Sequence, residues 1–264
     1  MNWYFYRVWI PLQLLTVLGV VGACMGLITV NWWIVFAAFF LMGPVGIGVG
    51  FHRLFSHRSF ETWRPVEIAL ALFGTLSAYA PVLFWTSNHQ YHHRHADYEE
   101  DPSSPWVHGF WESFFTYRMR EGVLKKIDLR NTPSRRILKD KVLMFLSKHF
   151  NKVVWGYALL TLLIGGPSLL VSAFLFPAAL EHLRTNVVSS LSHLPIPLSY
   201  RNHSTDDTSY NNIILGYLTF GFSWHNNHHA DEKAISCHQK WWEVDVEGMI
   251  AKLLQKNGNT TPNS

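Results

Sequence analysis

The 264-residue sequence contains few cysteines and few charged residues. Two residues are cysteine, Cys24 and Cys237, too few for a disulfide framework, an iron–sulfur cluster or a thiolate metal site. Charged residues make up 15% of the chain, against roughly a quarter in an ordinary soluble domain. The mean hydropathy is nevertheless only +0.06, so a polar portion must accompany any apolar spans. A redox metal would need other ligands, and 15 histidines could supply them.

Long apolar runs predict an all-α integral membrane protein. Its four membrane-spanning helices are expected at about residues 8–30, 32–51, 151–166 and 168–190. At 1.5 Å per residue, runs of about 20 residues cross a hydrocarbon core of about 30 Å. The last two runs are separated by Gly165-Gly166-Pro167, which predicts a turn. The helices therefore form two hairpins.

The distribution of charge predicts the orientation. The net charge is +4, and basic residues are concentrated between the two hairpins, as expected for a cytoplasmic loop. Nucleic-acid binding is the weaker interpretation of these residues. If all histidine groups share one metal centre, an even number of crossings separates them, so the apolar run at residues 66–85 does not cross. We expect both termini, a helical cap (residues 52–150 and 191–256) and the active site in the cytoplasm. We expect a disordered tail at 257–264.

Eight histidines occur in three groups. They are His52 and His57, then His89, His92 and His93, then His225, His228 and His229. On an α-helix, positions i, i+3 and i+4 lie within about 100° of arc, so each triplet projects three imidazoles from one face. Positions i and i+5 lie about 140° apart. The helix that carries the first pair is therefore expected to end between its two histidines.

This clustering predicts a metal site. A single histidine is usually a surface or hydrogen-bonded residue, and we interpret His95, His108, His149, His182, His203 and His238 in this way. Eight clustered imidazoles without a shared partner would cost about 1–3 kcal/mol for each unsatisfied group. Imidazole suits Zn, Cu, Fe or Ni, and a structural zinc ion needs only four ligands. Candidate hydrogen-bond partners of the ligands are Asp97, Glu99, Glu100, Asp101, Asp231 and Glu232. Two irons that react with dioxygen on a lipid-like substrate are the best interpretation.

The motifs resemble those of the membrane fatty acyl desaturases, specifically the Δ9-type acyl-CoA and acyl-lipid branch. The resemblance rests on His52-Arg53-Leu54-Phe55-Ser56-His57-Arg58-Ser59, on the second triplet followed by Asp101-Pro102-Ser103-Ser104-Pro105, on Ser223-Trp224-His225-Asn226-Asn227-His228-His229-Ala230, and on Trp241-Trp242-Glu243-Val244-Asp245. It covers about residues 40–255.

The resemblance implies further site residues. His193 matches a ninth ligand of the family. Ser189 stands where the family usually has an asparagine that contacts one iron through water, and Phe222 stands where plant and cyanobacterial relatives tend to have glutamate. In animal acyl-CoA desaturases the closed end of the substrate tunnel lies against the second helix, so Phe36 and Phe40 are candidates for this end.

The family's chemistry implies an O2-dependent cis double bond in a saturated acyl chain that is linked to CoA or to a lipid. The electrons would come from a separate protein, ferredoxin or cytochrome b5 with its reductase. The basic stretch 118–141 is a candidate dock for this donor. Two alternatives stay open. One is a hydroxylase or ketolase of the same superfamily. The other is a membrane metal transporter or sensor, which is disfavoured because the motifs lie at the ends of spans, whereas transporters bind near the midplane.

Overall fold

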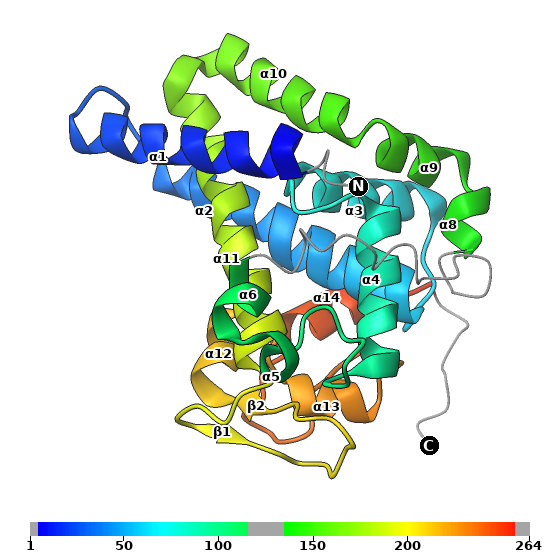
Figure 1. Ribbon diagram of the computed structural model, residues 1–264. Helices are drawn as coiled ribbons and strands as arrows, with labels where there is room; N and C mark the ends of the chain where they lie inside the picture. The colour runs from blue at the N-terminus through cyan, green and yellow to red at the C-terminus, as the bar shows by residue number, and fades with distance from the viewer. Residues whose placement is uncertain (1–4, 116–134, 257–264) are drawn as a thin grey trace.

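The structure is a computed structural model that describes residues 5–115 and 135–256. The described chain is mostly helical, with one two-stranded sheet. The expected disordered tail and most of the proposed donor dock, residues 118–134, lie outside the described residues. Figure 1 shows the long helices on one side of the molecule and shorter elements gathered below them.

The first hairpin begins with η1 (Phe5–Trp9) and α1 (Ile10–Cys24) and returns through α2 (Trp32–Phe40) and η2 (Leu41–His57). Tyr6–Cys24 and Trp32–His57 are each long and apolar enough to cross a membrane. The first helix ends at Cys24, earlier than the predicted residue 30, because Gly26 adopts a left-handed conformation (φ 72°). Asn31 caps the returning helix by accepting hydrogen bonds from the backbone N–H groups of Trp33 and Ile34.

The third candidate span is one continuous run of 42 residues, Phe150–Leu191. It comprises α10 (Phe150–Leu170), η4 (Val171–Leu175) and α11 (Phe176–Leu191). A straight helix of this length would be about 63 Å long, twice a hydrocarbon core. Gly165 and Gly166 have non-helical backbone angles, and the chain turns back there (Figure 1). The predicted turn at these glycines is therefore present in the structure.

The apolar run at residues 66–85 is divided between α3 (Arg64–Leu76) and α4 (Val82–His95). Ser77 lies at the break, where its hydroxyl donates to the Gly74 carbonyl and accepts from the backbone N–H of Tyr79. Helix α3 packs closely along η2. Gly46 permits this close approach, because a Cβ at this position would lie only 2.3 Å from the Gly74 backbone nitrogen. The run is thus neither one helix nor a candidate span.

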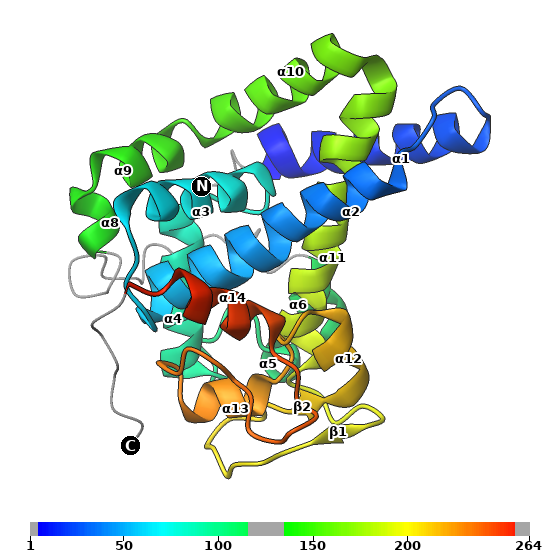
Figure 2. The ribbon, with the colours of Figure 1, turned by 180° about the vertical axis from the view of Figure 1, so that it is seen from behind.

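The remaining elements are short. They are α5 (Pro105–His108), α6 (Phe110–Phe115), α8 (Arg135–Lys139), α9 (Lys141–Lys148), β1 (Ser199–Tyr200), β2 (Asn211–Asn212), α12 (Ile213–Leu218), α13 (His225–Ala230) and α14 (Val246–Leu254). The strands pair antiparallel, with Ser199 opposite Asn212. Seen from behind, α14 lies across η2 (Figure 2).

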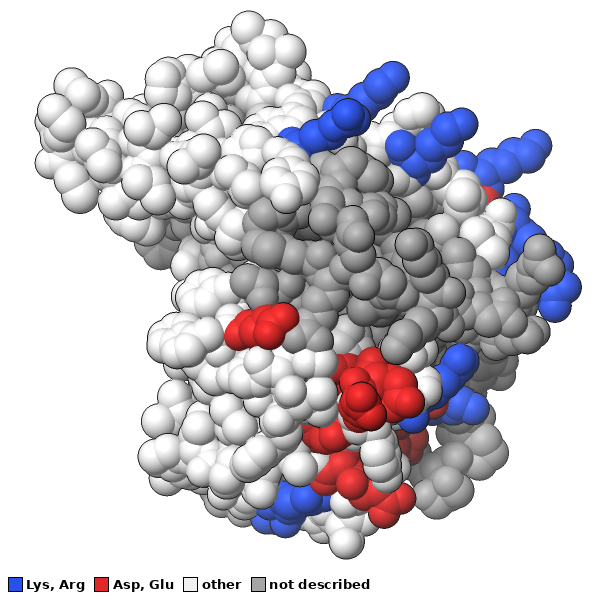
Figure 3. Space-filling model, in the orientation of Figure 1, with Lys and Arg blue, Asp and Glu red and all other residues white. Residues whose placement is uncertain are grey.

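Exposed side chains differ between the two ends of the long helices. Leu18, Leu163 and Ile164 are 63%, 74% and 71% exposed, as expected for side chains that face lipid. On the face shown in Figure 3, the turns of the two hairpins carry no charged side chain. Lys and Arg gather instead toward α8 and α9. The structure thus separates an apolar end from a basic end.

Candidate metal centre

His52 and His57 both lie in η2, so the helix does not end between them as predicted. The segment is π-helical, and residues five apart in a π-helix lie one turn apart on the same side. Their ring centroids are 4.9 Å apart. The helix ends immediately after His57, because Arg58 adopts a left-handed conformation (φ 55°). The prediction failed because it assumed α-helical geometry.

The two predicted triplets lie on α4 and α13, and each contributes to two groups of histidines. Group 1 consists of His52, His57, His89, His93 and His228. Group 2 consists of His92, His193, His225 and His229. The two groups adjoin, since the rings of His93 and His229 stack at a centroid distance of 4.4 Å. The structure therefore brings together all nine histidines that the sequence suggested.

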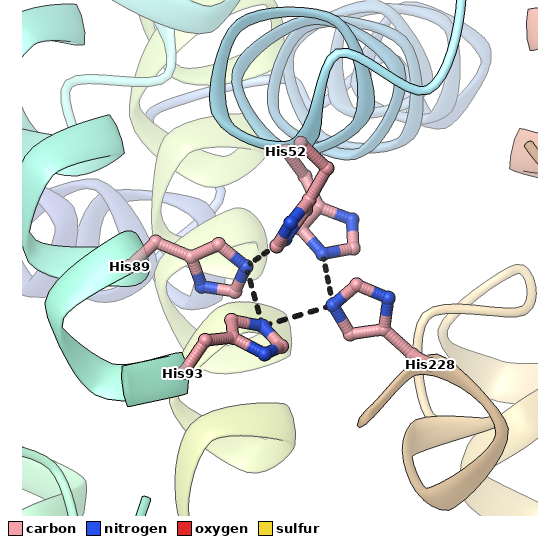
Figure 4. Close-up of side chains that lie close together, drawn as sticks. His52, His89, His93 and His228 are labelled. Atoms are coloured by element: carbon pink, nitrogen blue, oxygen red, sulfur yellow. Dashed lines mark hydrogen bonds between the residues drawn. The ribbon is translucent and has the colours of Figure 1, made fainter. Parts of the chain in front are cut away.

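The Nε2 atoms of group 1 converge. His89 and His93 project from α4 toward His52 and His228 (Figure 4). The Nε2 atom of His93 lies 3.1 Å from that of His89 and 3.0 Å from that of His228. The Nε2 atom of His228 also lies 2.9 Å from that of His52. In group 2, His225 Nε2 lies 3.0 Å from the Nε2 atoms of both His193 and His229.

These spacings fit a bound metal better than hydrogen bonding. A ring nitrogen carries either one proton or one lone pair, so His93 and His225 cannot form two good hydrogen bonds through one Nε2. An ion that binds imidazole nitrogen at about 2.1 Å separates ligands at a right angle by about 3.0 Å, and tetrahedral ligands by about 3.4 Å. The observed 2.8–3.1 Å fits right angles. Each group of nitrogens can therefore converge on one metal ion.

Three aspartates contact histidines of group 2 through Nδ1, the ring nitrogen that faces away from the centre. His92 Nδ1 lies 2.9 Å from Asp101, His193 Nδ1 lies 2.9 Å from Asp97, and His229 Nδ1 lies 2.8 Å from Asp207. Each contact fixes the ring and leaves Nε2 facing the centre, as is usual for histidine ligands of metals. Asp97 reaches His193 from a left-handed turn (φ 64°) just beyond α4.

The sequence identified two of these three aspartates. Asp97 and Asp101 were candidates because they follow a triplet, whereas Glu99, Glu100 and Asp231 are exposed. Asp207 was missed, because it belongs to a loop 18 residues before His225 and no local pattern links it to His229. Glu232 lies 3.6 Å from His57 Nδ1, which is beyond hydrogen-bonding distance.

Electrostatics keep four of the histidines neutral and Asp101 charged. Burial, together with neighbouring histidines, lowers the pKa of His89, His93, His225 and His228 well below the ordinary value. Burial disfavours the charged form of Asp101, but His92 and backbone N–H groups outweigh it and lower the Asp101 pKa to about 2. Neutral imidazole is the form that binds metal, so these four histidines are available at neutral pH. His92 differs from these four, because Asp101 outweighs the effect of burial and raises the His92 pKa.

Helix α13 has six residues, too few to be stable alone, and buried amides hold it in place. Asn227 donates to Glu243 (2.9 Å) and to the Cys237 carbonyl (2.8 Å). Asn226 accepts hydrogen bonds from the backbone N–H groups of Asn202 and His203, both at 2.8 Å. The two asparagines within His225-Asn226-Asn227-His228-His229 therefore anchor the helix that carries three of the histidines.

A small cavity of about 40 Å³ adjoins both groups. His89 from group 1 and His92 and His225 from group 2 line it, together with the apolar side chains Tyr79, Phe84, Trp85, Val188 and Phe222. Its walls can therefore hold an apolar segment beside both groups.

Ser189 also lines this cavity, and its hydroxyl donates to the Thr185 carbonyl at 2.8 Å. Within the described structure, Phe36 and Phe40 do not line this cavity, and the Phe36 side chain is 54% exposed. Their rings stack on each other, and Phe40 packs against Phe220 at 5.5 Å. Their role as a tunnel end stays a prediction.

These features define a class of helical protein with three candidate membrane spans and two adjoining, buried, all-histidine sites that could bind metal. The family model for fatty acid desaturase matches residues 30–239. The chain belongs to this family, and it is an oxidoreductase that acts on fatty acyl chains.

Three relatives illustrate the similarity. The chain is 35% identical to an sn-1 stearoyl-lipid 9-desaturase of Anabaena variabilis, over 84% of this chain and 80% of the relative. It is 32% identical to Delta-9 acyl-lipid desaturase 1 of Arabidopsis thaliana, over 84% and 72%. It is 31% identical to an acyl-CoA C20 Delta5-desaturase of Anemone leveillei, over 88% and 73%.

Proposed function

We propose that this protein is a membrane-bound di-iron desaturase that introduces a cis double bond at the Δ9 position of a saturated, lipid-linked acyl chain. The observation that carries the proposal is the convergence of nine histidine nitrogens beside an apolar cavity. The lipid carrier and the Δ9 position rest on the similarity to the acyl-lipid 9-desaturases. A CoA-linked substrate is the alternative, because the Anemone relative is an acyl-CoA desaturase.

The five histidines of group 1 would hold one iron and the four of group 2 the other. Ser189 lines the cavity together with His89 of group 1 and with His92 and His225 of group 2, so a water molecule on its hydroxyl could contact one of the two irons. Bound iron would supply the activation of dioxygen. One O2, two electrons and two protons would be consumed as two adjacent CH2 groups lose two hydrogens, and the products would be one C=C bond and two waters.

The chain's own residues would position the substrate. The aromatic walls formed by Phe84, Trp85 and Phe222 would exclude water from the segment beside the histidines. A cavity of about 40 Å³ holds only a short part of an acyl chain, so the position of the double bond would depend on how these walls align one C–C bond with the centre.

The proposal includes four crossings, with the kinked helix Phe150–Leu191 crossing twice and both termini in the cytoplasm. The electron donor, ferredoxin or cytochrome b5, would then reach the centre from that side. The native Cys24 is exposed and lies at the turn of the first hairpin. It should react with an impermeant thiol reagent from outside. In a Cys24→Ser background, Glu99→Cys should react only from inside; labelling of both positions from one side would overturn this topology.

Expression in a host that lacks its own Δ9-desaturase tests the activity. We expect monounsaturated lipids with the double bond between carbons 9 and 10. Mass spectrometry of the dimethyl disulfide adducts of the fatty acids locates this double bond. The control is His228→Ala at a matched expression level. A product that has gained oxygen would instead indicate a hydroxylase, and an unaltered lipid profile with an added electron donor would contradict desaturation.

A further inference from the structure

The carboxylates around the centre are distributed unequally. In group 2, three of the four histidines contact an aspartate through Nδ1, and the Asp101, Asp97 and Asp207 side chains are 0%, 7% and 12% exposed. In group 1, the carboxylate found near a ring nitrogen within the described residues is Glu232. Its side chain is 49% exposed and lies 3.6 Å from His57 Nδ1 and 3.8 Å from His93 Nδ1.

The aspartates are themselves rigidly held. Asp97 accepts hydrogen bonds from the backbone N–H and the hydroxyl of Thr208, at 2.8 and 2.6 Å. Asp101 accepts from the backbone N–H and the hydroxyl of Ser103, both at 2.9 Å. Asp207 accepts from the backbone N–H of Ser209 at 2.8 Å. Group 2 is thus surrounded by fixed negative charges, and these charges do not depend on a metal for their position.

A buried dication needs compensating charge, because the protein interior solvates it poorly. A carboxylate on Nδ1 also makes the opposite nitrogen a stronger ligand and prevents the ring from turning. Group 1 has one more imidazole, but imidazole is neutral, and its nearby carboxylate is half-exposed. Both groups can be reached from solvent, since an open depression of about 690 Å³ is lined by His57, His93 and His229.

We propose that the two iron sites differ in affinity: group 2 holds its iron at least tenfold more tightly than group 1, and Asp97, Asp101 and Asp207 cause the difference. The centre would then load group 2 first and lose iron from group 1 first. This inference rests on the proposed di-iron function and adds to it an order of assembly that the chain's own carboxylates determine.

The test measures iron instead of activity. The full chain, purified in detergent and loaded anaerobically with ferrous iron, is titrated with a ferrous chelator, and bound iron per chain is measured by mass spectrometry. We expect two steps of one iron each, separated by at least tenfold in chelator concentration. Asp207→Asn should shift the tighter step by about 10- to 100-fold, and Asp101→Asn should do the same. The matched control Glu232→Gln should shift neither step by more than about threefold.

His52→Ala and His225→Ala assign the two steps. Both histidines have a buried Nδ1 that lacks a hydrogen-bond partner in the described structure, so neither truncation leaves a carboxylate unpaired. We expect His52→Ala to keep the tighter iron and His225→Ala to lose it. Thermal unfolding of the iron-free variants identifies any that do not fold. If one of the two aspartate variants does not fold, the other provides the test of the tighter step. Release of two irons in one step, or unchanged steps in both aspartate variants, overturns this inference alone. A chain that binds no iron overturns the proposed function as well.

Discussion

The hairpin helices and the short elements around the histidines are stabilised in different ways. In the hairpins, many large side chains such as Leu18 and Leu163 face outward, and the helices satisfy their own backbone groups. Around the centre, the six-residue α13 depends on buried hydrogen bonds, in which Asn227 accepts from Asn211 and donates to Glu243. The hairpins therefore require only apolar character at most positions, whereas the surroundings of the centre require particular partners.

A buried ion-pair network connects the two regions. Arg53, next to His52 on η2, contacts Asp245 at 2.9 Å and Glu247 at 2.6 Å. Glu247 also contacts Arg184 of α11 at 2.6 Å. Gly48 is required at this junction, because a Cβ there would lie 2.1 Å from the Glu247 carboxylate. The network therefore fixes the C-terminal segment against two of the long helices.

The largest effect is expected when a residue of the centre is removed. His228→Ala should reduce desaturation more than 100-fold, because it removes a group 1 nitrogen that lies 2.9 and 3.0 Å from its neighbours. The protein should still insert into membranes, since the hairpins do not depend on this residue. Lipid profiling and membrane fractionation measure the two outcomes. Substantial residual activity would show that His228 is not a ligand.

Breaking the buried network should affect stability strongly. Asp245→Asn leaves Arg53 partly unpaired, and losing one member of a buried ion pair typically costs about 3–5 kcal/mol. We expect a large fall in the thermal unfolding midpoint of the detergent-solubilised protein. The exposed Asp231→Asn is the control and should change stability by less than about 0.5 kcal/mol. Equal midpoints for the two variants would contradict a structural role for the network.

The hairpin region should respond to polarity rather than to shape. Leu18→Arg would place a charge on a lipid-facing side chain, at a cost of about 2.5–3.5 kcal/mol for insertion at a helix centre. Leu18→Ile keeps the side chain apolar and should leave membrane insertion unchanged. The fraction of chains recovered in the membrane distinguishes the two variants, and normal insertion of Leu18→Arg would show that this face of α1 does not contact lipid.

A smaller effect is expected for substrate length. If Phe40 closes the tunnel, Phe40→Ala should raise the preference for an 18-carbon over a 16-carbon chain by about tenfold, at about 0.8 kcal/mol per buried CH2. Competition between the two substrates measures the ratio, and Phe36→Ala provides a comparison. Unchanged ratios in both variants would assign the two rings to packing with Phe220.

The smallest effect is expected at Ser189. Its hydroxyl already bonds to its own helix, so Ser189→Asn should maintain or slightly raise iron occupancy by reaching further into the cavity. Iron per chain is the measurement. If Ser189→Ala and Ser189→Asn both leave iron content and turnover unchanged, the position has no role at the metal.

The sequence alone was enough for the apolar runs, the turn at Gly165-Gly166 and the three groups of eight histidines, because hydrophobicity and clustering along the chain are local properties. His193 lies outside these groups, and only the resemblance to the family suggested it. The sequence was not enough for the exact helix limits. The first helix ends at Cys24 because of a left-handed glycine, and His52 and His57 share a face because η2 is π-helical. Both depend on backbone angles that a hydrophobic pattern does not reveal.

Tertiary structure alone decided how the histidines divide into two groups and which carboxylates support them. His92 and His93 are adjacent in sequence yet belong to different groups, because neighbouring residues on a helix point about 100° apart and the partners come from separate elements. Asp207 meets His229 through the packing of a loop that no periodicity marks. Residue types and local spacing thus indicate eight of the candidate ligands, whereas contacts between distant segments determine their grouping and the charge around them.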